Sequence, residues 1–201
     1  PITVISTCLR VLEMETGKQK WIDKAQAQTE KLTALVNALV TLSRMDEGVS
    51  PLKMEPFPLS EAVADTTEPF RDLAQSKGHS LVLDIVPNLT YKGDEYAIRQ
   101  LVSILLDNAV KYARADSPIT LTLEKTRRGA VLRCRNGSDP IPEETLAKLF
   151  DRFYRADPSR NAATGGFGIG LSIARGIAEA HRGSICARMV GEEVEFAAEL
   201  R

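Results

Sequence analysis

Four glycines crowd a short stretch near the carboxyl end of the sequence, which reads GGFGIGLSIA over residues 165–174. Glycine has no Cβ, so its backbone N–H groups can approach an anion closely, and the amino end of a following helix strengthens the attraction. The stretch lacks the Gly-Lys-Ser/Thr ending of a P-loop, and its G-x-G-x-G core is also typical of a turn packed tightly on a helix. These residues alone leave a phosphate site and a plain turn as alternatives.

A second group of polar residues interrupts the largely apolar segment LVSILLDNAVKYA at 101–113. Asn108 and Lys111 are three residues apart, so a helix places them on one face. An amide oxygen can bind a hard cation, and a lysine offers a point charge to a phosphate. The apolar residues that closely flank them favour a binding face over an ordinary solvated one.

Two further segments have the composition of site-forming loops. NGSDPIP, residues 136–142, follows a predicted strand, and its first residue either points into a pocket or simply marks the exit of the strand into a turn. LFDRFYR, residues 149–155, places three aromatic residues among two arginines, and the polar residues 157–164 follow. An aromatic anchor, a polar segment and then glycines are typical of a lid.

Composition limits the class of protein. The formal net charge of the 201 residues is −1, so no general field attracts nucleic acid or an anionic membrane, and any anion site must be local. No apolar run approaches the roughly 20 residues of a spanning helix, so we expect a cytoplasmic chain without membrane contact. Cys8, Cys134 and Cys186 are far apart and odd in number, which predicts three buried free thiols rather than a metal site.

The first 46 residues have helical periodicity. Residues 2–14 and 18–46 each carry an apolar stripe with steps of three and four, and residues 15–18 can turn between them. Two helices cannot bury both stripes alone, so we predict an antiparallel hairpin that dimerises into a four-helix bundle. The stripe of the second helix consists of Trp21, Ala25, Gln28, Leu32, Leu35, Leu39 and Leu42.

Gly48, Ser50 and Pro51 interrupt this periodicity and indicate a linker. We expect a hairpin over residues 1–48, a linker over 49–57 and a second domain over 58–201. In that domain the pattern predicts helices at 59–76, 94–113 and 168–181, and strands at 81–86, 119–124, 131–135, 184–190 and 194–200. Because strands and helices do not alternate regularly, an α+β sandwich is favoured over a doubly wound sheet.

The order of the segments carries more information than any one of them. LLDNAVKYA, NGSDPIP, LFDRFYRAD and GGFGIGLSIA follow one another in the way that the N, G1, F and G2 boxes do in two-component sensor histidine kinases, which the chain resembles over essentially its whole length. The resemblance implies an α/β sandwich of the gyrase, Hsp90 and histidine kinase type, preceded by half of a dimeric four-helix bundle.

The resemblance also implies roles for individual residues. Asn108 would bind the Mg²⁺ that bridges the phosphates of ATP, Lys111 would meet a phosphate, and Asn136 would accept a hydrogen bond from the adenine amino group. Arg152 and Arg155 would reach the γ-phosphate. The implied nucleotide-binding set is Asn108, Lys111, Tyr112, Asn136, Gly137, Ile141, Gly166, Gly168, Ile169, Gly170 and Leu171.

The function implied is that of a protein-histidine kinase core, which transfers the γ-phosphoryl of ATP to a histidine and then to an aspartate of a response-regulator receiver domain. Ile104 stands where the related gyrase-type ATPases place a glutamate, and it cannot act as a general base, which argues against a hydrolase. A non-catalytic nucleotide-binding or regulator-docking pseudokinase is the alternative, and a gyrase-type or Hsp90-type ATPase a third.

The start of the chain, PITVI, resembles the sequence just after the acceptor histidine of the family. We therefore expect a chain that does not phosphorylate itself, taken from a parent anchored in a bacterial inner or plasma membrane. The two histidines fit other roles: His79 is expected on a surface turn, and a cationic His181 is expected to cap the last helix.

Overall fold

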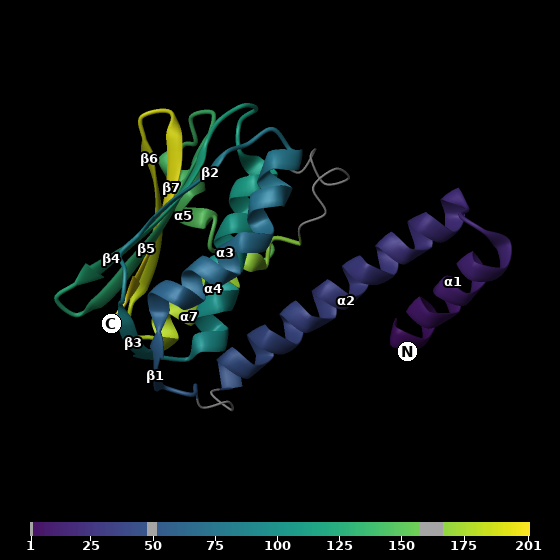
Figure 1. Cartoon of the computed structure of the whole chain (residues 1–201), viewed down its shortest axis with the longest axis horizontal. Helices are drawn as coiled ribbons and strands as arrows, with labels where there is room; N and C mark the ends of the chain where they lie inside the picture. The colour runs from purple at the N-terminus through teal and green to yellow at the C-terminus, as the bar shows by residue number, and fades with distance from the viewer. Residues whose placement is uncertain (1, 48–51, 157–166) are drawn as a thin grey trace. The chain divides into compact units, whose positions relative to one another are not determined.

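The computed structural model describes residues 2–47, 52–156 and 167–201 (Figure 1). The chain forms two compact units, Pro1–Ser50 and Pro51–Arg201. Strand β1 begins at Glu55, inside the range expected to be linker. Within the described residues, no helix has the length and apolar character that crossing a membrane requires.

The first unit is a helical hairpin. Helix α1 (Ile2–Thr16) and helix α2 (Lys20–Glu47) are joined at Gly17, whose φ of +74° turns the chain. Its N–H closes the last turn of α1 on Glu13, and the Gln26 side chain bonds to the Glu13 carboxylate across the pair at 2.9 Å. Ile22 is the one apolar side chain that is buried among those described here. The expected stripe is therefore largely uncovered, as at Trp21, Leu32 and Leu39; the side chain of Leu42 lies outside the described residues.

The second unit is a sandwich of one mixed sheet and a layer of helices, as expected (Figure 1). The sheet has the order β2-β4-β5-β7-β6, in which only β2 and β4 are parallel. The strands are β2 (Leu81–Ile85), β4 (Ile119–Thr126), β5 (Gly129–Gly137), β6 (Ser184–Val190) and β7 (Glu193–Leu200). A separate antiparallel pair joins β1 (Glu55–Pro58) to β3 (Thr90–Gly93).

The helical layer consists of α3 (Leu59–Ser76), α4 (Glu95–Tyr112) and α7 (Gly170–Ala180), with the short α5 (Glu143–Lys148) at the side. Helix α4 begins where the Asp94 carboxylate accepts a hydrogen bond from the backbone N–H of Ala97 at 2.9 Å, a standard N-cap. Its apolar side packs on the alternating inward residues of β4 and β5. The buried residues that build this core include Ile98, Leu101, Leu105, Leu106, Ile119, Leu121, Leu132 and Leu200.

Both histidines differ from expectation because tertiary contacts bury them. His79 is not on the surface: its Nδ1 lies 3.1 Å from the carbonyl oxygen of Ser117. His181 is fully buried, and its Nε2 accepts a hydrogen bond from the backbone N–H of Asp94 at 3.0 Å. Its Nδ1 lies 2.8 Å from the carbonyl oxygen of Ile177. His181 does stand at the C-cap of the last helix, as expected, but these two bonds suit a neutral ring with the proton on Nδ1 rather than the expected cation.

All three cysteines were expected to be buried free thiols, but only one of them is buried. Cys134 on β5 faces the core, where burial raises the pKa of its thiol to about 12. Cys8 and Cys186 are exposed, because no described residue of α1 is buried in the hairpin and Cys186 lies on the more exposed face of the edge strand β6.

Candidate functional site

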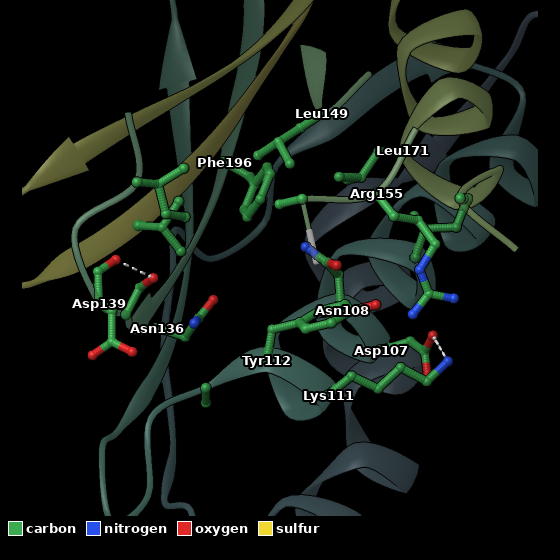
Figure 2. Close-up of a pocket in the computed structure, with 18 of the residues that line it drawn as sticks. Asp107, Asn108, Lys111, Tyr112, Asn136, Asp139, Leu149, Arg155, Leu171 and Phe196 are labelled. Carbon is green, nitrogen blue, oxygen red and sulfur yellow. Dashed lines mark hydrogen bonds and ion pairs between the residues drawn. The ribbon is translucent and has the colours of Figure 1, made fainter. Parts of the chain in front are cut away.

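One face of helix α4 forms the floor of a cavity of about 610 Å³ (Figure 2). The lining residues of this face are Ile104, Asp107, Asn108, Lys111 and Tyr112. Their spacing of three and four residues is that of a single helical stripe, and the buried stripe of α4 lies on the other side, against the sheet. The helix therefore holds its polar residues at a cavity while the sheet fixes its position.

The end of strand β5 and strand β7 form a second wall. Asn136 is only 1% exposed, and Figure 2 shows its side chain directed from β5 into the cavity. It pairs in register with Val194, which lines the cavity together with Phe196. The Asn136 amide donates to the carbonyl oxygen of Gly137 at 3.0 Å, which fixes the orientation of the side chain. This wall combines one fixed polar group with apolar contact surface.

The third wall contains both flanks of residues 157–166, which lie outside the described residues. The backbone N–H of Phe153 donates to the carbonyl oxygen of Gly168 at 2.9 Å, so the two flanks meet. Gly168 has a φ of +71°, and a Cβ there would lie 2.7 Å from the carbonyl oxygen of Tyr154. Glycine is needed at this position for both reasons.

Helix α7 starts at the cavity with Gly170 and Leu171 among the lining residues. Its N-cap residue is Ile169, and no side chain of the described part of the chain caps it. The first backbone N–H groups of the helix thus lack the usual side-chain acceptor, and they carry the positive end of the helix dipole. An uncapped helix start of this kind is a suitable place for an anion, which is consistent with the phosphate interpretation of the glycine stretch.

Ion pairs order the charged groups at the cavity. The Nζ of Lys111 lies 2.5 Å from Oδ2 of Asp107, one helical turn earlier (Figure 2). Arg114 pairs with Glu192 of the β6–β7 turn at 2.7 Å. This hydrogen bond raises the pKa of the Arg114 guanidinium and lowers the pKa of the Glu192 carboxyl. Two cations of the cavity lining, Lys111 and Arg114, therefore already have carboxylate partners.

The residues also suit a magnesium ion carried by a phosphate group. The Asn108 side chain faces the cavity and has no hydrogen-bond partner among the described residues, so its amide oxygen is available as a hard ligand. Ile104, one turn earlier, offers no ligand. Mg²⁺ keeps most of its coordination shell as water and phosphate oxygen, so one protein ligand is sufficient.

Most of the site residues expected from the sequence meet at this cavity. Gly137, Ile169 and Arg152 do not line it: a Cβ on Gly137 would collide with Ser117, and Ile169 is buried beneath the start of α7. Gly166 lies outside the described residues. The expected residues that do line it are Asn108, Lys111, Tyr112, Asn136, Ile141, Arg155, Gly168, Gly170 and Leu171.

Sequence reasoning missed other parts of the cavity wall. Val194 and Phe196 are two residues apart in the last strand, so the sequence predicts that both face the helices. It does not predict that they reach the cavity. Arg114 carried no signal of this kind, because it lies in a connection between elements, whereas Asp139 belongs to the NGSDPIP segment that was singled out as a loop of the site. Leu149 and Tyr154 belong to the aromatic segment that was singled out as an anchor.

Comparison with known proteins agrees with this geometry. The family model described as "Histidine kinase-, DNA gyrase B-, and HSP90-like ATPase" matches residues 93–201, which include every wall of the cavity. The chain is 32% identical over 200 residues to the sensor protein DltS of Streptococcus agalactiae, covering all of this chain and 50% of the relative. It is 33% identical over 162 residues to the histidine-protein kinase BaeS of Escherichia coli, covering 81% of this chain and 35% of the relative.

Solved structures share the fold. Full-length ShkA in complex with AMPPNP superposes with a TM-score of 0.81 at 20% identity, covering 100% of this chain and 43% of that one. ThkA in complex with the response regulator TrrA gives a TM-score of 0.68 at 21% identity, covering 100% and 57%. The chain thus spans about half the length of such proteins.

The matched range begins at the end of β3 and contains α4, the Asn136 turn and the glycine stretch, the elements that build the cavity. The chain therefore belongs to the family of histidine kinase-, DNA gyrase B- and HSP90-like ATPases, and it carries the catalytic core of a sensor histidine kinase.

Proposed function

We propose that the cavity binds Mg-ATP and holds its γ-phosphoryl group for transfer to a histidine, from which an aspartate of a response regulator receives it. The observation that carries the proposal is the convergence of Asn108, Lys111 and the uncapped start of α7 on one cavity of about 610 Å³. A volume of this size suits a nucleotide. The AMPPNP bound to ShkA and the regulator bound to ThkA are consistent with both partners.

The cavity walls suggest how the nucleotide lies. Lys111 and the first N–H groups of α7 face the phosphates, with Arg155 of the cavity lining near the γ-phosphate. Asn136 accepts from the adenine amino group, and Tyr112 lies along the base. Apolar residues such as Ile141, Leu149 and Phe196 complete the pocket for the base. They have no side-chain polar group that the bound base would leave without a hydrogen-bond partner. Mg²⁺, held by Asn108, neutralises phosphate charge when it is bound.

The chain's own residues favour transfer over hydrolysis. Ile104 occupies the position beside Asn108 where a general base would have to act on water, and its side chain has no basic atom. Phosphoryl transfer needs mainly positioning and charge stabilisation, which the lysine, the helix N-terminus and the arginines supply. The acceptor is a histidine outside this chain, because His79 and His181 are both buried in hydrogen bonds.

The helical hairpin supports a dimer. Large apolar side chains on α1 and α2 remain exposed, including Val4 at 64% and Trp21 at 73%. Exposed apolar patches mark interaction surfaces in many proteins. We propose that a second copy covers it in a four-helix bundle, with residues 1–48 as the dimerisation unit, 49–57 as the linker and 58–201 as the ATP-binding domain. The parent would be a membrane-anchored sensor whose core lies in the cytoplasm.

Asn108→Ala tests the metal role. We expect loss of magnesium-dependent nucleotide binding in calorimetric titration, because alanine removes the one side-chain oxygen proposed as a ligand. Gln100→Ala, on the same helix and away from the cavity lining, is the matched control and should bind as the wild type does. Unchanged affinity of the Asn108→Ala variant in the presence of magnesium would refute the role of Asn108.

A further inference from the structure

Helix α4 offers its phosphate-facing lysine together with a carboxylate. The Nζ of Lys111 lies 2.5 Å from Oδ2 of Asp107, and both residues line the cavity. Figure 2 shows the pair side by side at the cavity, next to Asn108. The stripe that α4 presents to the cavity therefore has no net charge, although it contains the cation expected to meet a phosphate.

The rest of the lining adds little positive charge. Beyond the Asp107–Lys111 pair, the charged side chains among the described lining residues are Arg114, Asp139 and Arg155. Arg114 is already paired with Glu192 at 2.7 Å. A metal-free triphosphate would thus place its concentrated negative charge beside the Asp107 carboxylate in a cavity that is close to neutral. A bound divalent cation removes much of that repulsion, because it cancels part of the phosphate charge.

We propose that Asp107 is a specificity-determining residue, which makes the cavity select the metal–nucleotide complex over the metal-free nucleotide. The inference rests on the proposed nucleotide-binding function and gives a role to a residue that this function does not otherwise use. Asp107 acts on the charge of the ligand and on the position of Lys111. It binds neither the base nor the metal.

A structural role alone is the competing explanation. An acidic residue four positions before a basic one stabilises many helices slightly, and such pairs are normally at the surface. The Arg175–Glu179 pair on α7 has this spacing at 2.9 Å and lies away from the cavity. Its side chains are 52% and 57% exposed, against 30% for Lys111 and 48% for Asp107. A helix-stabilising role predicts the same behaviour for both pairs, and the proposed role does not.

The experiment compares ATP affinity in excess Mg²⁺ with ATP affinity in EDTA, by calorimetric titration of the whole chain. Asp107→Asn removes the charge and keeps the size, so metal-free ATP should gain more affinity than Mg-ATP. We expect the affinity for Mg-ATP, divided by the affinity for metal-free ATP, to fall by about fivefold. This is the effect of removing one unit charge at about 4 Å in water. Asp107→Glu keeps the charge and should keep the ratio near that of the wild type.

Glu179→Gln is the matched control, since it removes one carboxylate from a pair with the same spacing and should leave the ratio unchanged. The proposal is overturned if Asp107→Asn leaves the ratio unchanged, or lowers it only by weakening Mg-ATP binding. If the folded wild type binds neither form of ATP, the proposed function fails and this inference fails with it. Binding of Mg-ATP by the wild type with no response to Asp107→Asn overturns this inference alone.

Discussion

Replacing Glu195 by glutamine should destabilise the sandwich by about 2 kcal/mol at neutral pH. The Glu195 side chain is fully buried on strand β7, on the face of the sheet opposite the helices. Its carboxylate accepts hydrogen bonds from Arg135 of β5 at 2.5 Å and from Arg188 of β6 at 2.7 Å. Three neighbouring strands are thereby joined at one residue.

The expected loss of stability follows from the two hydrogen bonds to the Glu195 carboxylate and from the exposure of the arginines that donate them. Each hydrogen bond between charged groups contributes about 1.5–3 kcal/mol before the cost of burying the carboxylate is subtracted. Arg135 and Arg188 are 37% and 60% exposed, so water screens the pair and reduces the gain. Glutamine would keep one amide oxygen that can accept from one arginine, but it would present an NH2 donor to the other guanidinium and would lose the negative charge that both arginines now face. A net loss of about 2 kcal/mol results.

Urea unfolding followed by circular dichroism measures this loss. Glu199→Gln is the control, since Glu199 lies on the same face of β7 but is exposed in its pair with Arg201, and we expect less than about 0.5 kcal/mol there. Val194 and Phe196, on either side of Glu195, line the cavity. Loosening of β7 should therefore also weaken nucleotide binding.

The pH dependence gives a second test. Burial opposes ionisation of Glu195, but the hydrogen bonds from Arg135 and Arg188 outweigh it and hold the pKa of this carboxyl below its ordinary value. The stabilisation is complete above the unfolded pKa of about 4.3 and is lost as the pH falls through the lower folded value. The difference between wild type and Glu195→Gln should therefore shrink in acid. Equal stability at pH 7, or a difference independent of pH, would refute the reasoning.

Two further variants test other parts of the account. Gly168→Ala should lower the unfolding temperature and weaken ATP binding, because φ is +71° and the Cβ would lie 2.7 Å from a backbone oxygen. Gly191→Ala has a similar φ in open space and isolates the cost of φ alone; equal effects of the two would contradict the contact argument. Replacing Leu32, Leu35 and Leu39 by alanine should give a monomer in light scattering, and a persistent dimer would show that this stripe is not the interface.

The elements of the catalytic core could be predicted where periodicity is strong. Helix α4 and strands β4 to β7 were located to within a few residues, because each has one apolar side long enough to recognise. Strands β1 and β3 and helix α5 have only four to six residues and were not predicted. So few residues do not complete two periods of a helix or establish alternation in a strand.

Contacts between distant elements explain what the sequence did not reveal. His181 looked like an exposed helix end, but β3 and the start of α4 cover it. Glu195 sits on the outward side of β7, and only the register with Arg135 and Arg188 buries it. The order of motifs indicated the helix stripe, the Asn136 turn and the glycines. The Asp107–Lys111 pair and the Arg114–Glu192 pair required side-chain positions.

The central claim is that this chain binds ATP together with magnesium in the cavity above α4. Calorimetric titration of the folded chain with ATP, with and without Mg²⁺, tests it most directly. The account predicts binding at one site that depends on magnesium. Absence of binding in both conditions, in a sample whose circular dichroism shows the folded sandwich, would contradict it.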